Sequence, residues 1–208
     1  MNDTLKNIKL ISFIVFPLGI LAISSSSIIT RLAQGGAPSL VIAFYRLLIA
    51  SLVLLPIVVI SNRAEIRKID KKSFPLFFLA ATFLAAHFAT WISSLEYTSI
   101  ASSVVLVTTT PIWVAIFSPI FLKEKISWKM WMGILLAVSG SVVVGGSQAC
   151  QFSIGRQLIC PDLPNFFAGR NFLGNAFALF GAWMAAGYMI VGRKMRNKFS
   201  ISVYALTV

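Results

Sequence analysis

Long uninterrupted apolar runs constrain the fold of this chain more than any other feature. A helix needs roughly 20 apolar residues to cross the hydrocarbon core of a bilayer. Only 12% of the 208 residues are charged and 58% are hydrophobic, whereas an ordinary soluble domain has about 25% charged residues. Too little polar surface remains to cover a water-soluble globule. We therefore expect an all-α integral membrane protein whose six spans lie at 10–30, 40–60, 74–94, 101–122, 128–146 and 172–191.

A further apolar run begins near Phe199 and continues to Val208. About ten residues are too few for a crossing, so we expect the start of a seventh span in a longer protein; a short interfacial helix is the alternative. Lys6 and Lys9 precede the first run as they would in a signal peptide. That run continues to about residue 29, which suits a spanning helix better than the shorter apolar region of a signal.

The basic residues predict the orientation. Fourteen of the 18 lysines and arginines lie at the N-terminus or in the gaps after the second, fourth and sixth spans. The other gaps hold only Arg31, Arg156 and Arg170, and Arg46 lies inside the second span. By the positive-inside rule the N-terminus is cytoplasmic. The net charge of +12 therefore reflects membrane topology, and we expect no binding of nucleic acid.

The outer gap at 147–171 contains both cysteines of the chain, Cys150 and Cys160. In an oxidising outer compartment such a pair can form a disulfide, and two free thiols in a loop are the alternative. The chain has a single histidine, which lies elsewhere. We therefore expect no metal site and no cofactor.

The first and sixth spans resemble each other. Each is a helix rich in small residues that ends at an arginine, Arg31 or Arg193, and is followed by a run that contains Tyr45 or Tyr204. The offset is five spans, an odd number, so the two copies cross the membrane in opposite directions. The charges agree with that inversion, because no further basic residue follows Arg31 in its gap, whereas three follow Arg193. Inverted repeats are typical of secondary transporters, whose site lies between the repeats near the midplane of the membrane.

Four stretches in the same order resemble the EamA family of the drug/metabolite transporter superfamily. They read PSLVIAFYRLLIAS, SLEYTSIASSVVLVTTTPIWVAIFSPIFLKEKIS, GILLAVSGSVVV and GNAFALFGAWMAAGYMIVGRKMR. The resemblance covers nearly the whole chain. It implies ten helices in two inverted five-helix repeats, with 1–146 as the first repeat, 147–171 as an outside loop and 172–208 as the start of the second. It also implies transport of small metabolites, often amino acids or drugs, and commonly efflux.

Two polar features inside spans are candidates for substrate binding. Arg46 is a charge within a span, which is costly unless it is paired, reaches the surface or faces water. Its guanidinium could attract a carboxylate of the solute. Alternatively, the side chain could snorkel to the membrane surface or pair with a neighbouring helix. His87, Trp91, Ser94 and Thr98 share one helical stripe. That stripe suits either an aqueous cavity or a helix interface, and a neutral imidazole there could bond a solute or a neighbouring helix.

Further candidates lie in the fourth and sixth spans. Thr108, Thr109 and Thr110 precede Pro111, which cannot donate a bond to the carbonyl of Val107. Threonine side chains stabilise such kinks, so this is a structural bend or a solute contact. We also expect Trp183 and Tyr188, with the matching Ser24–Ser27 of the first span, to line the cavity. Other polar and small residues suggest structural roles: a packing face at Gly133, Ala137 and Gly140, and a solvated ion pair or gate at Glu124.

The predicted function is secondary transport of amino-acid-like or drug-like solutes across the plasma membrane by alternating access. No GxxxxGK[ST] pattern occurs in the sequence, so nothing in it encodes a nucleotide motor. A non-transporting membrane scaffold or receptor is the first alternative. An integral membrane enzyme is the second, although no acidic residue lies in the core of a span. The partners we expect are a small-molecule substrate and the lipid bilayer, and a homo-oligomer is possible.

Overall fold

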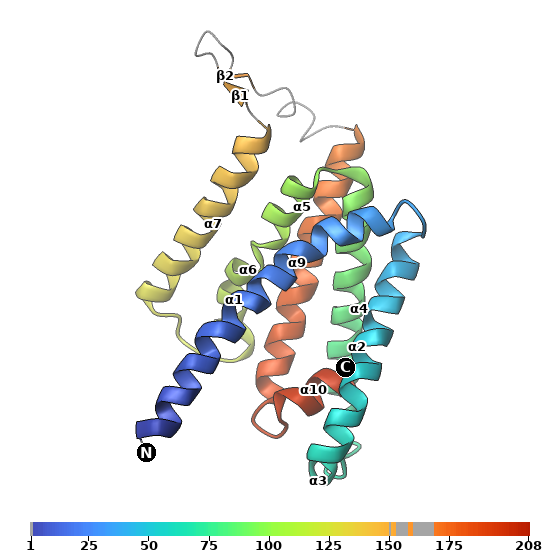
Figure 1. Ribbon diagram of the computed structural model, residues 1–208, viewed down its shortest axis with the longest axis vertical. Helices are drawn as coiled ribbons and strands as arrows, with labels where there is room; N and C mark the ends of the chain where they lie inside the picture. Colours follow the sequence, from blue (N-terminus) through green and yellow to red (C-terminus); the bar gives the residue numbers. More distant parts are fainter. Residues whose placement is uncertain (1, 150, 153–157, 160–168) are drawn as a thin grey trace.

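The computed structural model describes residues 2–149, 151–152, 158–159 and 169–208 (Figure 1). The fold is a bundle of helices with one minimal hairpin, in which β1 and β2 are antiparallel and Gln151 lies opposite Ile159. The elements in chain order are α1 (Asn2–Ala33), α2 (Ser39–Ser61), α3 (Arg63–Ile66), α4 (Phe74–Tyr97), α5 (Ile100–Val107), α6 (Thr110–Phe121), α7 (Trp128–Ala149), β1 (Gln151–Phe152), β2 (Leu158–Ile159), α9 (Gly169–Met195) and α10 (Ile201–Thr207).

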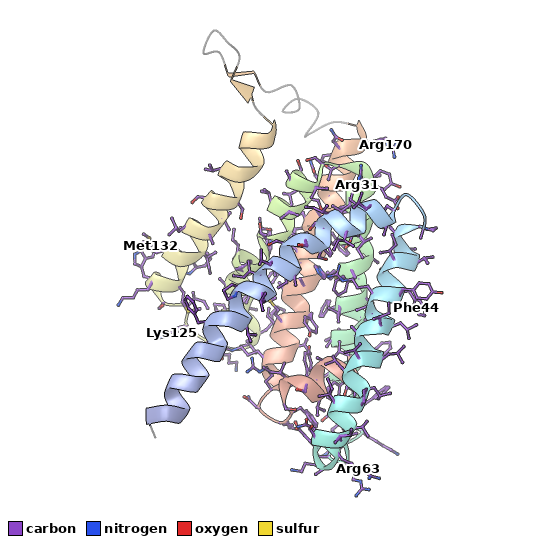
Figure 2. The ribbon with its side chains drawn as sticks, viewed as in Figure 1. Arg31, Phe44, Arg63, Lys125, Met132 and Arg170 are labelled. Carbon is purple, nitrogen blue, oxygen red and sulfur yellow. The ribbon has the colours of Figure 1, made fainter. Side chains whose placement is uncertain are left out.

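Helices occupy all six predicted spans. Within the described part of the chain, α2, α4, α5 together with α6, and α9 are long and apolar enough to cross a membrane. The apolar stretches described in α1 and α7, Pro17–Ala33 and Trp128–Val143, are shorter. Phe44 and Met132 point outward from the bundle, with 61% and 53% of their surface exposed (Figure 2). Such large apolar side chains suit a lipid environment, and the chain is an all-α membrane protein.

The turns lie at two opposite ends of the bundle. The α1–α2 turn and the β1–β2 hairpin lie at one end, whereas α3 and α10 lie toward the other (Figure 1). Arg31 and Arg170 are near the first end and Arg63 is at the second (Figure 2). The basic and the poorly basic gaps in the sequence thus lie on opposite sides of the fold. That the basic end faces the cytoplasm stays a prediction from the charges.

Small residues on α9 allow it to pack closely against α4. Ala178 and Ala182 are fully buried, and a Cβ atom on Gly174 would lie 2.8 Å from the Cβ of Thr98. This is the close backbone approach that small residues permit between membrane helices. The sequence predicts such a face at Gly133, Ala137 and Gly140 of α7 instead. That assignment finds no support, because a Cβ on Gly133 or Gly140 would meet nothing within 4 Å in the described structure.

A break between α5 and α6 confirms the bend expected at Pro111. α5 ends at Val107 and α6 begins at Thr110. The Thr110 hydroxyl donates to the Val107 carbonyl over 2.7 Å, and this is the carbonyl that Pro111 cannot bond. The other two hydroxyls of the run bond in the same way, Thr108 to the carbonyl of Val105 at 2.8 Å and Thr109 to that of Leu106 at 2.6 Å.

The short helix α10 docks on the ends of α2, α4 and α9 near α3. The Phe199 ring, just before α10, lies 5.2 Å from that of Phe77 on α4. The Tyr204 hydroxyl donates to the carbonyl of Tyr188 over 3.0 Å. Glu65 of α3 accepts a hydrogen bond from the backbone N–H of Ser200, the residue that caps α10. Apolar packing and these polar contacts together fix the start of α10 against the first part of the chain.

Candidate functional site

Arg46 of α2 turns into the space between α1 and α4. Its Nη1 atom donates to the Ser26 hydroxyl of α1 over 2.5 Å. The guanidinium carbon lies 5.0 Å from the ring centroid of Phe88 and 5.4 Å from that of Trp91, both on α4. The charge is therefore held beside these rings, between α1 and α4.

The neighbours of Arg46 satisfy only part of its hydrogen-bonding capacity. A guanidinium has five N–H donors, and one hydroxyl accepts from it. Two aromatic faces add cation–π attraction. Among the carboxylates that the structure describes, none bonds to Arg46. Its side chain also lines an open groove of about 570 Å³ between α1 and α2, whose wall includes Ser26, Thr30 and Tyr45.

Trp91 lies next to Arg46, and His87 stacks on Trp91. Trp91 is only 8% exposed, and its Nε1 atom is buried without an acceptor among the described residues. The His87 ring stacks on it with 6.0 Å between centroids and 7° between planes. His87 Nδ1 lies 2.8 Å from the Gly181 carbonyl of α9. A carbonyl oxygen can only accept, so Nδ1 carries the proton and Nε2 of a neutral ring is an acceptor.

The other members of the stripe hold the helices together. Ser94 is fully buried. Its hydroxyl donates to the Trp91 carbonyl over 2.6 Å and lies 2.6 Å from the Ser103 hydroxyl of α5. The Thr98 hydroxyl donates to Asn175 Oδ1 of α9 over 2.9 Å. These bonds fix α4 against α5 and α9 and so position the segment that carries Trp91.

The remaining predicted residues lie in two other places. Thr109 accepts a hydrogen bond from Trp113 Nε1 over 3.1 Å, and the Trp113 ring meets that of Trp183 edge to face at 5.2 Å. Thr108 is exposed beside them at the break between α5 and α6. Tyr188 stacks on Tyr204 of α10 at 5.4 Å. Of the predicted set, the structure brings together Arg46, His87 and Trp91, with Ser26 from the serine run of α1.

Sequence reasoning did not single out several residues of these clusters. Phe88 lies three positions before Trp91, and Trp113 lies four positions after Thr109, so helical spacing from a chosen residue could have found both. A contact at the start of α2 had no such signal. There, Glu96 of α4 accepts hydrogen bonds from the backbone N–H and the hydroxyl of Ser39 at the start of α2. These groups are 57 residues apart in the sequence.

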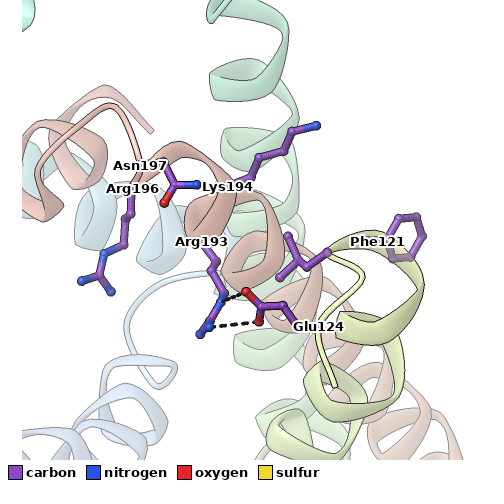
Figure 3. Close-up of a pocket in the computed structure, with 7 residues that line it drawn as sticks. Phe121, Glu124, Arg193, Lys194, Arg196 and Asn197 are labelled. Atoms are coloured by element: carbon purple, nitrogen blue, oxygen red, sulfur yellow. Dashed lines mark hydrogen bonds and ion pairs between the residues drawn. The ribbon is translucent and has the colours of Figure 1, made fainter. Parts of the chain in front are cut away.

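A second pocket of about 520 Å³ lies where α6 ends, beside the end of α9. Here Arg193 and Glu124 form a two-pronged ion pair, with Nε to Oε1 at 3.0 Å and Nη2 to Oε2 at 2.9 Å (Figure 3). The expected solvated ion pair at Glu124 is confirmed, with Arg193 as its partner. Because both side chains are substantially exposed, the pair adds little to stability. The pocket is also lined by Phe121, Leu122, Lys194, Arg196 and Asn197.

No group of three His, Cys, Asp or Glu residues that could hold a metal ion occurs in the part of the chain that the structure describes. Both Cys150 and Cys160 lie outside the described residues, so their expected pairing stays a prediction.

Comparison with known proteins assigns the family. The model of the EamA-like transporter family matches residues 10–146. An S-adenosylmethionine uptake transporter of Rickettsia bellii (strain RML369-C) is 26% identical over 144 residues, which are 69% of this chain and 48% of that protein. The chain thus spans about half the length of this curated relative, and no solved structure matches it significantly. The match to the family model, over more than half of the chain and over the helices that carry Arg46, His87 and Trp91, shows that the protein belongs to the EamA-like transporter family.

Proposed function

We propose that the protein is a secondary transporter that moves small metabolites across the membrane by alternating access. The observation that carries the proposal is the position of Arg46, a cation within a span that contacts α1 and α4 and has unused donors beside an open groove. Intramembrane charges are costly and mark solute or ion pathways. The proposed binding site is the cluster of Arg46, His87 and Trp91, and Ser94 holds it in place.

We further propose that the chain comprises a first repeat at 1–146, an outside loop at 147–171 and the start of an inverted second repeat at 172–208. Two contacts at the α3 end join the first segment to the last: Glu124 with Arg193, and Glu65 with Ser200. In alternating access the two repeats rock around a site near the midplane. These two contacts would form the inner gate, because they must separate when the site opens toward the cytoplasm. We place the N-terminus on the cytoplasmic side. The membrane is the plasma membrane.

Thr108, Thr109, Trp183 and Tyr188 complete the proposed solute path. Thr109 and Trp183 both contact Trp113, and Tyr188 stacks on Tyr204 of α10. Aromatic walls with few polar anchors are typical of small-molecule sites.

The proposed solutes are amino-acid-like, in keeping with the named substrate of the relative from Rickettsia bellii. The family resemblance favours efflux, whereas that relative is named for uptake. A carrier that uses no ATP runs in either direction according to the gradients. We propose net efflux, and the test therefore has to measure both directions.

A counterflow assay on the full-length protein tests the function. Proteoliposomes loaded with a mixture of unlabelled amino acids and S-adenosylmethionine should accumulate labelled solute from outside beyond empty-vesicle controls, and preloaded label should leave faster when solute is added outside. Exchange without chemical change of the solute supports a carrier. Binding without exchange would indicate the scaffold or receptor alternative, and a modified solute recovered from the vesicles would indicate an enzyme.

A further inference from the structure

Arg46 and Trp91 both have hydrogen-bond donors that the described residues leave unused. Among the described residues, the guanidinium of Arg46 bonds only to Ser26, and Trp91 Nε1 is buried with no acceptor. The two groups are adjacent, since the guanidinium carbon lies 5.4 Å from the Trp91 ring. A buried polar group without a partner is uncommon and costs about 1–3 kcal/mol. Trp91 Nε1 is such a group, and the half-buried Arg46 beside it has spare donors, which together indicate that an acceptor from outside the chain belongs between them.

The acidic side chains that the structure describes are already engaged elsewhere. Glu65 accepts from Ser200, and Glu96 accepts from Ser39. The remaining two are Asp70, which accepts from the backbone N–H of Ser73, and Glu124, which pairs with Arg193. None of these four is therefore the missing partner of Arg46.

We propose that Arg46 and the indole N–H of Trp91 together hold a free carboxylate of the transported solute. This inference rests on the proposed transport function and names the substrate class of its site. A carboxylate offers two oxygens in the plane that a guanidinium fork recognises. One carboxylate can thus accept from Arg46 and from a neighbouring donor. The rings of Phe88 and His87 beside these donors provide apolar and aromatic contact for the rest of the solute.

The experiment compares matched solutes that differ only at the carboxyl group. Full-length protein in proteoliposomes is offered radiolabelled L-methionine and L-phenylalanine, S-adenosylmethionine, and the carboxamide of each. The wild-type protein is expected to take up the acids at least about tenfold faster than the amides, since a hydrogen bond to a charged group is worth about one to two orders of magnitude in binding.

Four variants, compared at equal amounts of folded protein, locate the preference. Arg46→Gln should bring the ratio of acid to amide uptake close to one. Arg46→Lys keeps the charge but loses the fork, so it should retain part of the ratio. Trp91→Phe keeps an aromatic ring but removes the N–H, and should lower the ratio several-fold. Arg31→Gln, at an exposed arginine in the last turn of α1, is the matched control and should keep the wild-type ratio.

The outcomes separate this inference from the transport proposal. Equal uptake of acids and amides by the wild-type protein overturns the carboxylate site and leaves transport standing. A preference for acids that survives in Arg46→Gln also overturns it, because the preference then arises elsewhere. Failure of both solute sets to enter overturns the inference together with the function on which it rests.

Discussion

Replacing Gly174 with alanine would force α4 and α9 apart. The added methyl group would lie 2.8 Å from both the Cβ and the backbone nitrogen of Thr98, and 2.9 Å from the carbonyl carbon of Tyr97. Two of these three atoms are backbone, so a side-chain rotation cannot relieve the clash. Overpacking of this kind costs about 1–3 kcal/mol. Alanine recovers about 0.5–1 kcal/mol over glycine within a helix, so the middle of the two ranges gives a net loss of about 1 kcal/mol.

Thermal unfolding of purified protein in detergent, followed by tryptophan fluorescence, measures this loss. For a protein of this size the midpoint should fall by about 2–4 °C. Gly140→Ala is the matched control on α7, since its Cβ would meet nothing within 4 Å among the described residues; it should unfold at the wild-type temperature or slightly above it. A wild-type midpoint for Gly174→Ala would refute the close packing of α4 on α9. Equal destabilisation by both substitutions would refute the assignment of the packing face to α9.

Three further predictions concern the bend, the α10 contact and the orientation. Thr110→Val keeps the side-chain shape but leaves the Val107 carbonyl without its donor, so the free energy of unfolding should fall by about 1–3 kcal/mol; no change in the midpoint would contradict this role. The backbone N–H of Ser200 holds the pKa of the Glu65 carboxyl below its usual value. Its stabilisation is therefore present above the unfolded pKa of about 4.3 and is lost as pH falls through the lower folded value. Glu65→Gln should weaken the acid dependence of the midpoint, and an unchanged profile would argue against the contact. In intact cells, a membrane-impermeant maleimide applied after mild reduction should label Cys150 and Cys160. The variant Lys71→Cys should gain no label at position 71, and labelling there would reverse the topology.

The sequence was informative where one segment alone determines the structure. The span limits follow from the length of each apolar run, and the break before Pro111 follows from one missing donor and the threonines beside it. Helix faces were less predictable. Glycines on α7 and α9 look alike in sequence. Only tertiary packing shows that a Cβ on Gly174 would meet Thr98, whereas one on Gly140 would meet nothing within 4 Å in the described part of the chain.

The candidate site was predicted in part for the same reason. Helical spacing put His87, Trp91 and Ser94 on one stripe of α4, but the helix ends at Tyr97 and Thr98 is its extended C-cap. The spacing did not show that Ser94 bonds to α5 and Thr98 to α9, while the Trp91 ring lies next to Arg46. Contacts such as that of Glu65 with Ser200 join residues 135 positions apart. No local pattern encodes them, because each partner alone resembles an ordinary residue of a polar gap.

Transport by Arg46→Gln, normalised to the amount of folded protein, tests the central claim most directly. The substitution removes the charge but keeps much of the stem, so the loss of packing should be modest. We expect the thermal midpoint to stay near that of the wild-type protein while solute counterflow falls by about tenfold or more, as the loss of a hydrogen bond to a charged group predicts. If counterflow instead falls only in proportion to folded protein, Arg46 is a structural residue and the cluster around it is not the binding site.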